Sequence, residues 1–270
     1  MESYNMSIDN IHTLIKEALL LIDKIAKKNN LEYYLHAGSV LGAIRHNNLI
    51  PWDDDADIIV PVTNYARFID CLRQSDLGKF CILYRDKYST KMQAKLILKG
   101  QDEDLMCIDI FPLIGTSDCV KKQKKQCKNA TFLRKVYFYK KMKVNNSKNI
   151  IKRIAKVLIK IMLLPFTERW FDKQFDKIMT KYDYNSANFV TNPCGKYKMK
   201  NIIPKSWYGF PACGVISGNE FPIPSNYQDY LKHYYNDFMK LPSEDYQKSV
   251  INKERLFMGT KEDFEKCIQE

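Results

Sequence analysis

The stretch HAGSVLGAIRHNNLIPWDDDADIIV, which runs from His36 to Val60, places a cluster of acidic residues directly in front of a strand-like sequence. Four of five consecutive positions are acidic, although the whole chain is basic, with 43 Lys and Arg against 31 Asp and Glu. The acidic residues are Asp53, Asp54, Asp55 and Asp57. Such a concentration of negative charge in a basic protein indicates either a solvated turn or a site for a cation.

The spacing of these acidic residues favours a cation site. Residues two apart in a strand point to the same face, with Cα atoms roughly 6.5–7 Å apart, so Asp55 and Asp57 should be aligned. Asp109 interrupts a later apolar run, MCIDIFPL, where an unpaired buried carboxylate would be costly. Hard oxygen ligands of this kind suit Mg²⁺, with Mn²⁺ as the alternative ion. We therefore expect Asp55, Asp57 and Asp109 to be metal ligands and catalytic; the opposing interpretation is a backbone-satisfied Asp109 beside a solvated turn.

Four nearby residues are typical of phosphate binding. Gly38 and Ser39 stand between a predicted strand and a predicted helix, where backbone N–H groups and a helix N-terminus can face an anion. Arg45 follows on the same predicted helix, and Lys95 lies in a strand-like run among apolar residues. Each cation alone has an equally simple structural explanation, and it is their combination with the acidic cluster that favours phosphate chemistry.

The hydrophobic pattern predicts an α/β (α+β) fold with a mixed sheet flanked by helices. A first amphipathic helix has its apolar face between Ile11 and Ile25. Strand-like runs follow at 31–38, 56–61, 79–86, 91–100 and 105–115, and helical patterns at 39–46, 64–74, 118–183 and 225–239. We expect Ser39 to begin the second helix and Thr63 to cap the third. The expected parts are a catalytic core at 1–117, a basic helical insertion at 118–184, and a C-terminal segment at 185–270 that completes the site.

The positive charge is concentrated in the predicted insertion. Between Asp118 and Pro165 there are fifteen Lys and Arg and one acidic residue, so this segment carries +14 and the remainder −2. Within it, residues 148–164 place Lys148, Lys152, Lys156 and Lys160 four apart, with apolar residues on the opposite side of the helix. This pattern predicts an interfacial helix on an anionic membrane. Two alternatives are an ordinary surface helix with its apolar face on the core, and nucleic-acid binding, which we do not expect because no known binding module is visible.

The sequence also bears on location. It has no uninterrupted apolar run near the ~20 residues that span a bilayer, and its first residues lack the pattern of a signal peptide. We therefore expect a cytoplasmic protein, either free or held on the inner face of the membrane.

Residues 36–58 resemble the LicD family, whose pattern is G-[TS]-x-L-G-x-x-R-H-x-x-x-I-P-W-D-D-D-x-D. The match includes Gly38, Ser39, Leu41, Gly42, Arg45, His46, Ile50, Pro51, Trp52, Asp53 to Asp55 and Asp57. AKLI at 94–97 resembles the family's Lys-bearing strand, IDIFPL at 108–113 its third-Asp strand, and residues 221–242 its C-terminal region. In that last region Asn236 stands where the family usually has Gly, and residues 118–183 are the least family-like.

The resemblance implies a nucleotidyltransferase-like fold and a specific activity. The expected enzyme is a phosphotransferase that moves phosphocholine, or a related phospho-alcohol, from a CDP-alcohol such as CDP-choline. The expected acceptor is a lipid-linked glycan precursor of teichoic acid, lipopolysaccharide or capsule. Trp52, Asp53 and Asp54 join the expected substrate-binding residues. A choline head favours aromatic faces, for which Trp207 and Tyr208 are candidates.

Two other functions are compatible with the same residues. A nucleotidyltransferase acting on RNA or a small molecule would keep the acidic residues and use the basic segment to hold nucleic acid. A non-catalytic membrane-binding protein would keep the fold alone. The nucleotidyltransferase would release pyrophosphate from a nucleoside triphosphate, whereas the phosphotransferase would release CMP from CDP-choline.

Overall fold

The computed structural model describes residues 3–85, 89–101, 105, 107–142, 150–251 and 254–269. Its main sheet has the strand order β2 (Tyr34–Leu35), β3 (Asp55–Pro61), β6 (Cys107–Thr116), β5 (Ala94–Leu98) and β4 (Phe80–Leu83). β3 and β6 are parallel, and the other neighbours along this order are antiparallel. The C-terminal part of β6 also pairs with β7 (Phe189–Thr191), which pairs with β8 (Ile203–Pro204). This is the mixed sheet that the sequence predicts.

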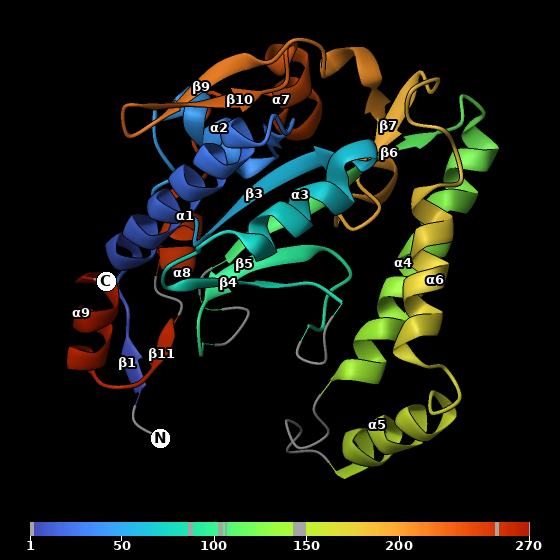
Figure 1. The fold of residues 1–270 in the computed structure, drawn as a ribbon, viewed down its shortest axis with the longest axis horizontal. Helices are drawn as coiled ribbons and strands as arrows, with labels where there is room; N and C mark the ends of the chain where they lie inside the picture. Colours follow the sequence, from blue (N-terminus) through green and yellow to red (C-terminus); the bar gives the residue numbers. More distant parts are fainter. Residues whose placement is uncertain are drawn as a thin grey trace.

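Helices α1 (Ile8–Lys28) and α3 (Val62–Gln74) pack against each other and against β6 (Figure 1). The expected apolar face of α1 is buried from Ile11 to Ile25. The beginning of α3 differs from the prediction that Thr63 caps it. β3 runs to Pro61, Pro61 itself is the N-cap, and the helix starts at Val62, so Thr63 lies inside the first turn.

Helix α2 (Gly38–Arg45) begins one residue before the expected Ser39, with Ala37 as N-cap at a φ of 45°. A side chain at Gly42 would place a Cβ 2.6 Å from the carbonyl oxygen of Asn48, because the chain folds back over the helix there. The hairpin of β9 (Ala212–Ile216) and β10 (Asn219–Ile223) packs on α2 from elsewhere in the sequence. Glycine at position 42 is required because the backbone at Asn48 approaches α2 this closely.

The predicted helical insertion contains α4 (Val120–Lys141), α5 (Ile150–Met162) and α6 (Glu168–Met179). Figure 1 shows α4 and α6 side by side, with α5 across the end that is farthest from the sheet. The chain leaves the sheet after β6 and returns in β7, where Thr116 and Phe189 are register partners. The block therefore projects from two adjacent strand ends.

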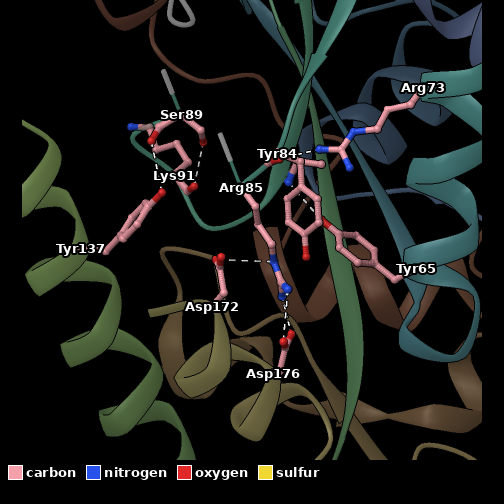
Figure 2. A network of polar contacts seen from close by, with 10 residues as sticks. Tyr65, Arg73, Tyr84, Arg85, Ser89, Lys91, Tyr137, Asp172 and Asp176 are labelled. Carbon is pink, nitrogen blue, oxygen red and sulfur yellow. Dashed lines mark hydrogen bonds and ion pairs between the residues drawn. The ribbon is translucent and has the colours of Figure 1, made fainter. Parts of the chain in front are cut away.

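Arg85, just after β4, ties this helical block to the core. Its guanidinium lies 3.7 Å from a carboxylate oxygen of Asp172 and also pairs with Asp176, both on α6 (Figure 2). The guanidinium carbon of Arg85 stacks 4.9 Å from the ring centroid of Tyr84. These contacts hold α6 against the strand side of the molecule.

The C-terminal part returns to the core. It contains the short helices η2 (Lys198–Asn201) and η3 (Lys205–Trp207), followed by α7 (Tyr227–Tyr235), α8 (Glu244–Ile251), β11 (Leu256–Met258) and α9 (Lys261–Gln269). β11 pairs with β1 (Ser3–Asn5). Asn236 ends α7 with a φ of 57°, a conformation that glycine also adopts easily. Within the described ranges, none of the helices is both long and apolar enough to cross a bilayer.

Candidate active site

Three charged side chains form a row across the centre of the sheet. Asp57 on β3 is the register partner of Asp109 on β6, and Asp109 is the register partner of Lys95 on β5. The Nζ atom of Lys95 lies 3.8 Å from Oδ1 of Asp109, and its side chain is only 3% exposed. Gln93 donates a hydrogen bond from Nε2 to the same oxygen at 3.2 Å. Asp109 therefore lies between a second carboxylate and a buried cation.

Asp55 completes a cluster of carboxylates. One oxygen each from Asp55, Asp57 and Asp109 lies within 4.8 Å of the others. Burial raises the pKa of Asp55 to about 7, and the negative charges of Asp53 and Asp109 add to the effect. The pKa of Asp57 is raised well above its ordinary value, first by burial and then by Asp55. Because ionised carboxylates repel one another at this spacing, the arrangement favours a bound cation.

Two hydrogen bonds to the backbone of Asp57, one with Ser39 on α2 and one with His36 just before α2, fix its position. Its N–H donates to Oγ of Ser39 at 2.8 Å, and its carbonyl oxygen accepts from the N–H of His36 at 2.8 Å. Ser39, which the sequence predicts as a phosphate-binding residue, thus also holds the backbone of Asp57 in place. Ala37, two residues before Ser39, donates its N–H to the hydroxyl oxygen of Tyr230 at 2.9 Å.

His36 forms a buried link between this turn and the C-terminal part. Its Nδ1 and the Tyr230 hydroxyl are 2.8 Å apart, and its Nε2 and the side-chain nitrogen of Asn192 are 3.3 Å apart. Burial lowers the pKa of His36 to about 3, so the imidazole stays neutral. A neutral His36 can order the turn without adding charge to the site.

The first acidic residues of the cluster are held by other parts of the chain. A carboxylate oxygen of Asp54 lies 3.2 Å from the guanidinium of Arg255, and the carbonyl oxygen of Asp53 is 2.8 Å from Nε2 of His12. A Cβ at Gly38 would lie 3.1 Å from Oδ2 of Asp53, so the glycine lets the acidic stretch approach α2. Asp53 and Asp54 therefore lie beside the cluster of carboxylates, and Asp54 is paired with Arg255.

Two cavities meet at the carboxylates. The larger, of about 700 Å³, is called the basic cavity because its lining contains Lys91, Lys95, Arg134, Lys135, Lys196 and Lys198. The other, of about 550 Å³, is called the aromatic cavity because its lining contains Trp52, Tyr197, Tyr235, Phe238 and Tyr246. Both are lined by Ala37, Asp54, Asp55, Asp57, Lys196 and Tyr197. A ligand that spans the carboxylates can therefore occupy both cavities.

The family match covers the carboxylates of this site. Residues 30–171 match the family model described as LicD/FKTN/FKRP, nucleotidyltransferase domain. The chain belongs to the LicD family. The match starts before the turn at Gly38 and runs through β3, β5, β6 and α4 into α6. It confirms the predicted nucleotidyltransferase-like α/β fold, and it extends into the helical block that resembles the LicD family least by sequence.

Individual relatives of this LicD-family chain differ in how much they share with it. It is 24% identical over 250 residues to the lipopolysaccharide cholinephosphotransferase LicD of Haemophilus influenzae, which covers 83% of this chain and 88% of the relative. An uncharacterized protein of Rickettsia typhi is 33% identical over 89 residues, or 33% of this chain and 25% of the relative. Terminal uridylyl transferase 4 from Trypanosoma brucei with bound GTP, a solved structure, is 12% identical. It covers 57% of this chain and 50% of its own, with a TM-score of 0.24.

Arg45, a residue of the LicD pattern, lies at the edge of the aromatic cavity. Its guanidinium donates to the carbonyl oxygens of Phe238 at 3.0 Å and Lys240 at 3.3 Å, and stacks 5.7 Å from the ring centroid of Trp52. Arg45 therefore holds the segment after α7 against the site. Trp52 lines the same cavity, and its role in substrate binding stays a prediction.

The structure does not place the candidate aromatic residues Trp207 and Tyr208 at the site. Neither Trp207 nor Tyr208 is among the described residues that line the two cavities. The ring of Trp207 packs edge-on to His233, and the ring of Tyr208 packs edge-on to Tyr34, with centroids 5.7 and 5.0 Å apart. They support α7 and β2 instead.

Sequence reasoning missed Lys196 and Tyr197, which line both cavities. They lie in the Pro- and Gly-containing stretch NPCGKYK, which gives no periodic signal. Burial alone would lower the pKa of Lys196, but nearby negative groups, including Asp55 and Asp57, outweigh burial and raise it. Lys196 therefore stays charged beside the carboxylates.

Proposed function

We propose that this chain is a metal-dependent phosphotransferase. It moves phosphocholine, or a related phospho-alcohol, from a CDP-alcohol donor to a hydroxyl of a cell-surface glycan precursor. The observation that carries this proposal is the cluster of Asp55, Asp57 and Asp109 at the meeting point of a basic and an aromatic cavity. The name of the Haemophilus influenzae relative supports phosphocholine as the transferred group and lipopolysaccharide as one class of acceptor.

The carboxylate cluster fits Mg²⁺, with Mn²⁺ as the alternative ion. Mg²⁺ binds oxygen ligands and is commonly held by one or two carboxylates together with substrate phosphates. The raised pKa values of Asp55 and Asp57 reflect the same crowding of negative charge that a divalent ion relieves. When bound, such an ion would neutralise the donor diphosphate and the charge that develops as CMP leaves.

The charges of the two cavities favour one orientation of a CDP-choline donor. The basic cavity suits the CMP part because Lys95, Arg134 and Lys196 can face its phosphate and ribose. The aromatic cavity suits the trimethylammonium head because Tyr197 and Tyr235 offer ring faces and Asp53 offers a carboxylate. In this orientation the phosphate that carries choline lies at the carboxylates.

The reaction is a single displacement at that phosphorus. The acceptor hydroxyl oxygen attacks from the side opposite CMP, because phosphoryl transfer proceeds roughly in line. The new bond joins the acceptor oxygen to phosphorus, the bond to the CMP oxygen breaks, and CMP leaves with the bonding electrons. Asp109 accepts the hydroxyl proton, while Lys95 and Gln93 hold its carboxylate in place.

The test is a donor screen scored by CMP release. Purified protein with Mg²⁺ and an acceptor glycan is offered CDP-choline, CDP-ethanolamine, CDP-glycerol, CDP-ribitol and, separately, nucleoside triphosphates. We expect CMP from a CDP-alcohol, abolished by EDTA and restored by Mg²⁺ or Mn²⁺. Pyrophosphate released from a triphosphate, with no CMP from any CDP-alcohol, would instead identify a nucleotidyltransferase and overturn the proposal.

A further inference from the structure

Helix α5 turns its apolar side away from the rest of the protein. Ile151 is 73% exposed, Leu158 56% and Met162 74%. The other exposed apolar residues on the same arc of the helix are Ile154, Val157 and Ile161. At 100° per residue these positions form one continuous side. A soluble helix normally buries such a side, so its exposure requires an explanation.

The side of α5 that is more covered carries the charged residues. Lys156 and Lys160 are partly buried, as is Ile159 beside them, whereas the apolar arc is open. This is the reverse of an ordinary surface helix. The alternative in which α5 packs its apolar face on the core is therefore wrong for the described residues.

The position of α5 is fixed by contacts with the neighbouring helices. Lys140 near the end of α4 donates from Nζ to the carbonyl oxygen of Leu163 at 3.0 Å, just after α5. Lys141 forms an ion pair at 2.8 Å with Glu168, at the start of α6. Helix α5 lies across the far end of α4 and α6 (Figure 1), and its apolar residues are exposed there.

The turn after α5 extends the apolar surface with aromatic residues. Leu164, Phe166 and Trp170 are exposed, and the ring centroids of Phe166 and Trp170 are 4.7 Å apart. Tryptophan is enriched at the boundary between lipid and water, where one part of its ring system is apolar and another polar. The surface thus joins aliphatic side chains with an aromatic pair at its edge.

Charge identifies the partner of this surface. The chain has no acidic residue between Asp118 and Glu168, and Arg153, Lys156 and Lys160 flank the apolar arc. We propose that α5 and the turn after it, residues 150–170, bind an anionic membrane surface. The apolar arc enters the boundary between headgroups and acyl chains, and the basic residues meet the headgroup phosphates. Lys148, which the sequence pattern includes, lies outside the described residues.

Charge also argues against the other occupants. A second copy of α5 on the same apolar arc would bring two basic helices together with no acidic residues to balance them. Nucleic acid would require the basic side to be the open one, and here the apolar side is open. An anionic bilayer satisfies both the apolar arc and the bases.

The test is vesicle flotation with the full chain, which is independent of catalysis. We expect wild-type protein to float with vesicles of phosphatidylcholine mixed with phosphatidylglycerol, less with phosphatidylcholine alone, and less at ~1 M salt, where the Debye length is about 3 Å. Leu158→Glu should lower binding about tenfold or more. Lys156→Glu with Lys160→Glu should lower it at least about 25-fold, since each lost base near such a surface costs roughly fivefold. Phe210→Glu, at a residue 94% exposed elsewhere, should bind like wild type.

Two results would overturn the proposal. One is wild-type protein that ignores anionic vesicles at low salt. The other is a wild-type dimer in light scattering that Leu158→Glu converts to a monomer without any change in vesicle binding, which would assign the surface to self-association. Circular dichroism and thermal melting of each variant ensure that lost binding reflects the surface and not unfolding.

Discussion

The guanidinium of Arg255 lies 3.2 Å from a carboxylate oxygen of Asp54, so the C-terminal region is joined to the acidic stretch in front of β3. The side chain of Arg255 is 4% exposed and also donates to the carbonyl oxygens of Val250 and Ile251. A residue far from the site by sequence thus braces the strand entrance that carries Asp55 and Asp57.

Replacing this brace should destabilise the protein. Arg255→Met should lower the free energy of unfolding by about 3 kcal/mol, the cost of breaking a buried ion pair from one side. Arg67→Met is the matched control, because Arg67 is an exposed arginine that donates to the carbonyl oxygen of Asn29. Urea unfolding measures both, and a double-mutant cycle with Asp54→Asn isolates the pair. Equal losses of unfolding free energy in Arg255→Met and Arg67→Met would show that the ion pair of Arg255 and Asp54 contributes nothing specific.

Removing a charge from the cluster should abolish metal binding while preserving the fold. Asp55→Asn and Asp57→Asn keep the side-chain volume, but each removes the negative charge of one proposed metal ligand. The rate of CMP release should therefore fall more than tenfold, which corresponds to a rise of ~1.4 kcal/mol in the activation free energy. The metal-free variants should melt at the same temperature as wild type or higher, since repulsion is reduced. Calorimetric titration with Mg²⁺ measures binding, and Asp70→Asn on the exposed side of α3 is the control. Activity above a tenth of wild type in either variant would refute the metal assignment.

The cluster should make the stability of the metal-free protein depend on pH. The folded-state pKa of Asp55 is about 7, above its ordinary value of 3.8, so the folded protein binds more protons than the unfolded chain between these values. Its contribution to stability is therefore present at low pH and is lost as the pH rises through about 7. We expect the melting temperature in EDTA to fall from pH 5 to pH 8, and Mg²⁺ affinity to rise over the same range. A melting temperature in Asp55→Asn with the same pH dependence as wild type would contradict this assignment.

Cations of the basic cavity should control donor use. Lys95→Ala and Lys196→Ala should each raise the KM for the CDP-alcohol by about 10- to 150-fold, the effect of a lost charge-assisted contact of ~1.5–3 kcal/mol. Lys99→Ala is the control, because Lys99 is exposed just after β5. Steady-state kinetics with the donor varied measure the effect. Donor kinetics unchanged in both variants would make these lysines structural only.

Arg45→Ala should weaken donor use by a different route. The structure gives this arginine contacts with the carbonyl oxygens of Phe238 and Lys240, so its loss should release the segment that walls the aromatic cavity. We expect a higher donor KM together with faster proteolysis after α7. Arg45→Lys, which keeps the charge but not the forked geometry, should restore little of either. Normal proteolysis combined with a weakened donor would instead indicate direct phosphate contact.

The sequence could predict the cluster of carboxylates because local rules determine it. The two-residue spacing of Asp55 and Asp57 fixes their common face, and the apolar run around Asp109 identifies a buried strand. Their pairing across the sheet depends on register between strands that are about fifty residues apart, and no local pattern specifies that. The sequence therefore identifies the carboxylates of the cluster but does not position them.

The parts of the site that come from loops could not be predicted. Lys196 and Tyr197 reach the cavities through tertiary packing, and their neighbours in the sequence show no strand or helix period. Trp207 and Tyr208 are candidates for choline binding by residue type alone, and in the structure they pack against α7 and β2 instead. The charge pattern of residues 148–164 does predict an outward apolar side for α5, although an amphipathic pattern alone also allows a helix that packs this side on the core.

The pairing of Thr116 with Phe189 gives the helical block the properties of an exchangeable cassette. Partners in an antiparallel ladder have Cα atoms only ~4.5–5.5 Å apart, a gap that a two-residue hairpin turn can close. Evolution can therefore lengthen, shorten or replace residues 117–188 without changing the strand order of the sheet. The entropic cost of closing a longer insertion grows only slowly with its length. What a replacement must retain is an apolar surface such as that of Phe171 and Phe175, which are buried in the core, together with the cations that α4 contributes to the basic cavity, Arg134 and Lys135. The strand pair can thus keep its carboxylates fixed while the attachment beside them changes.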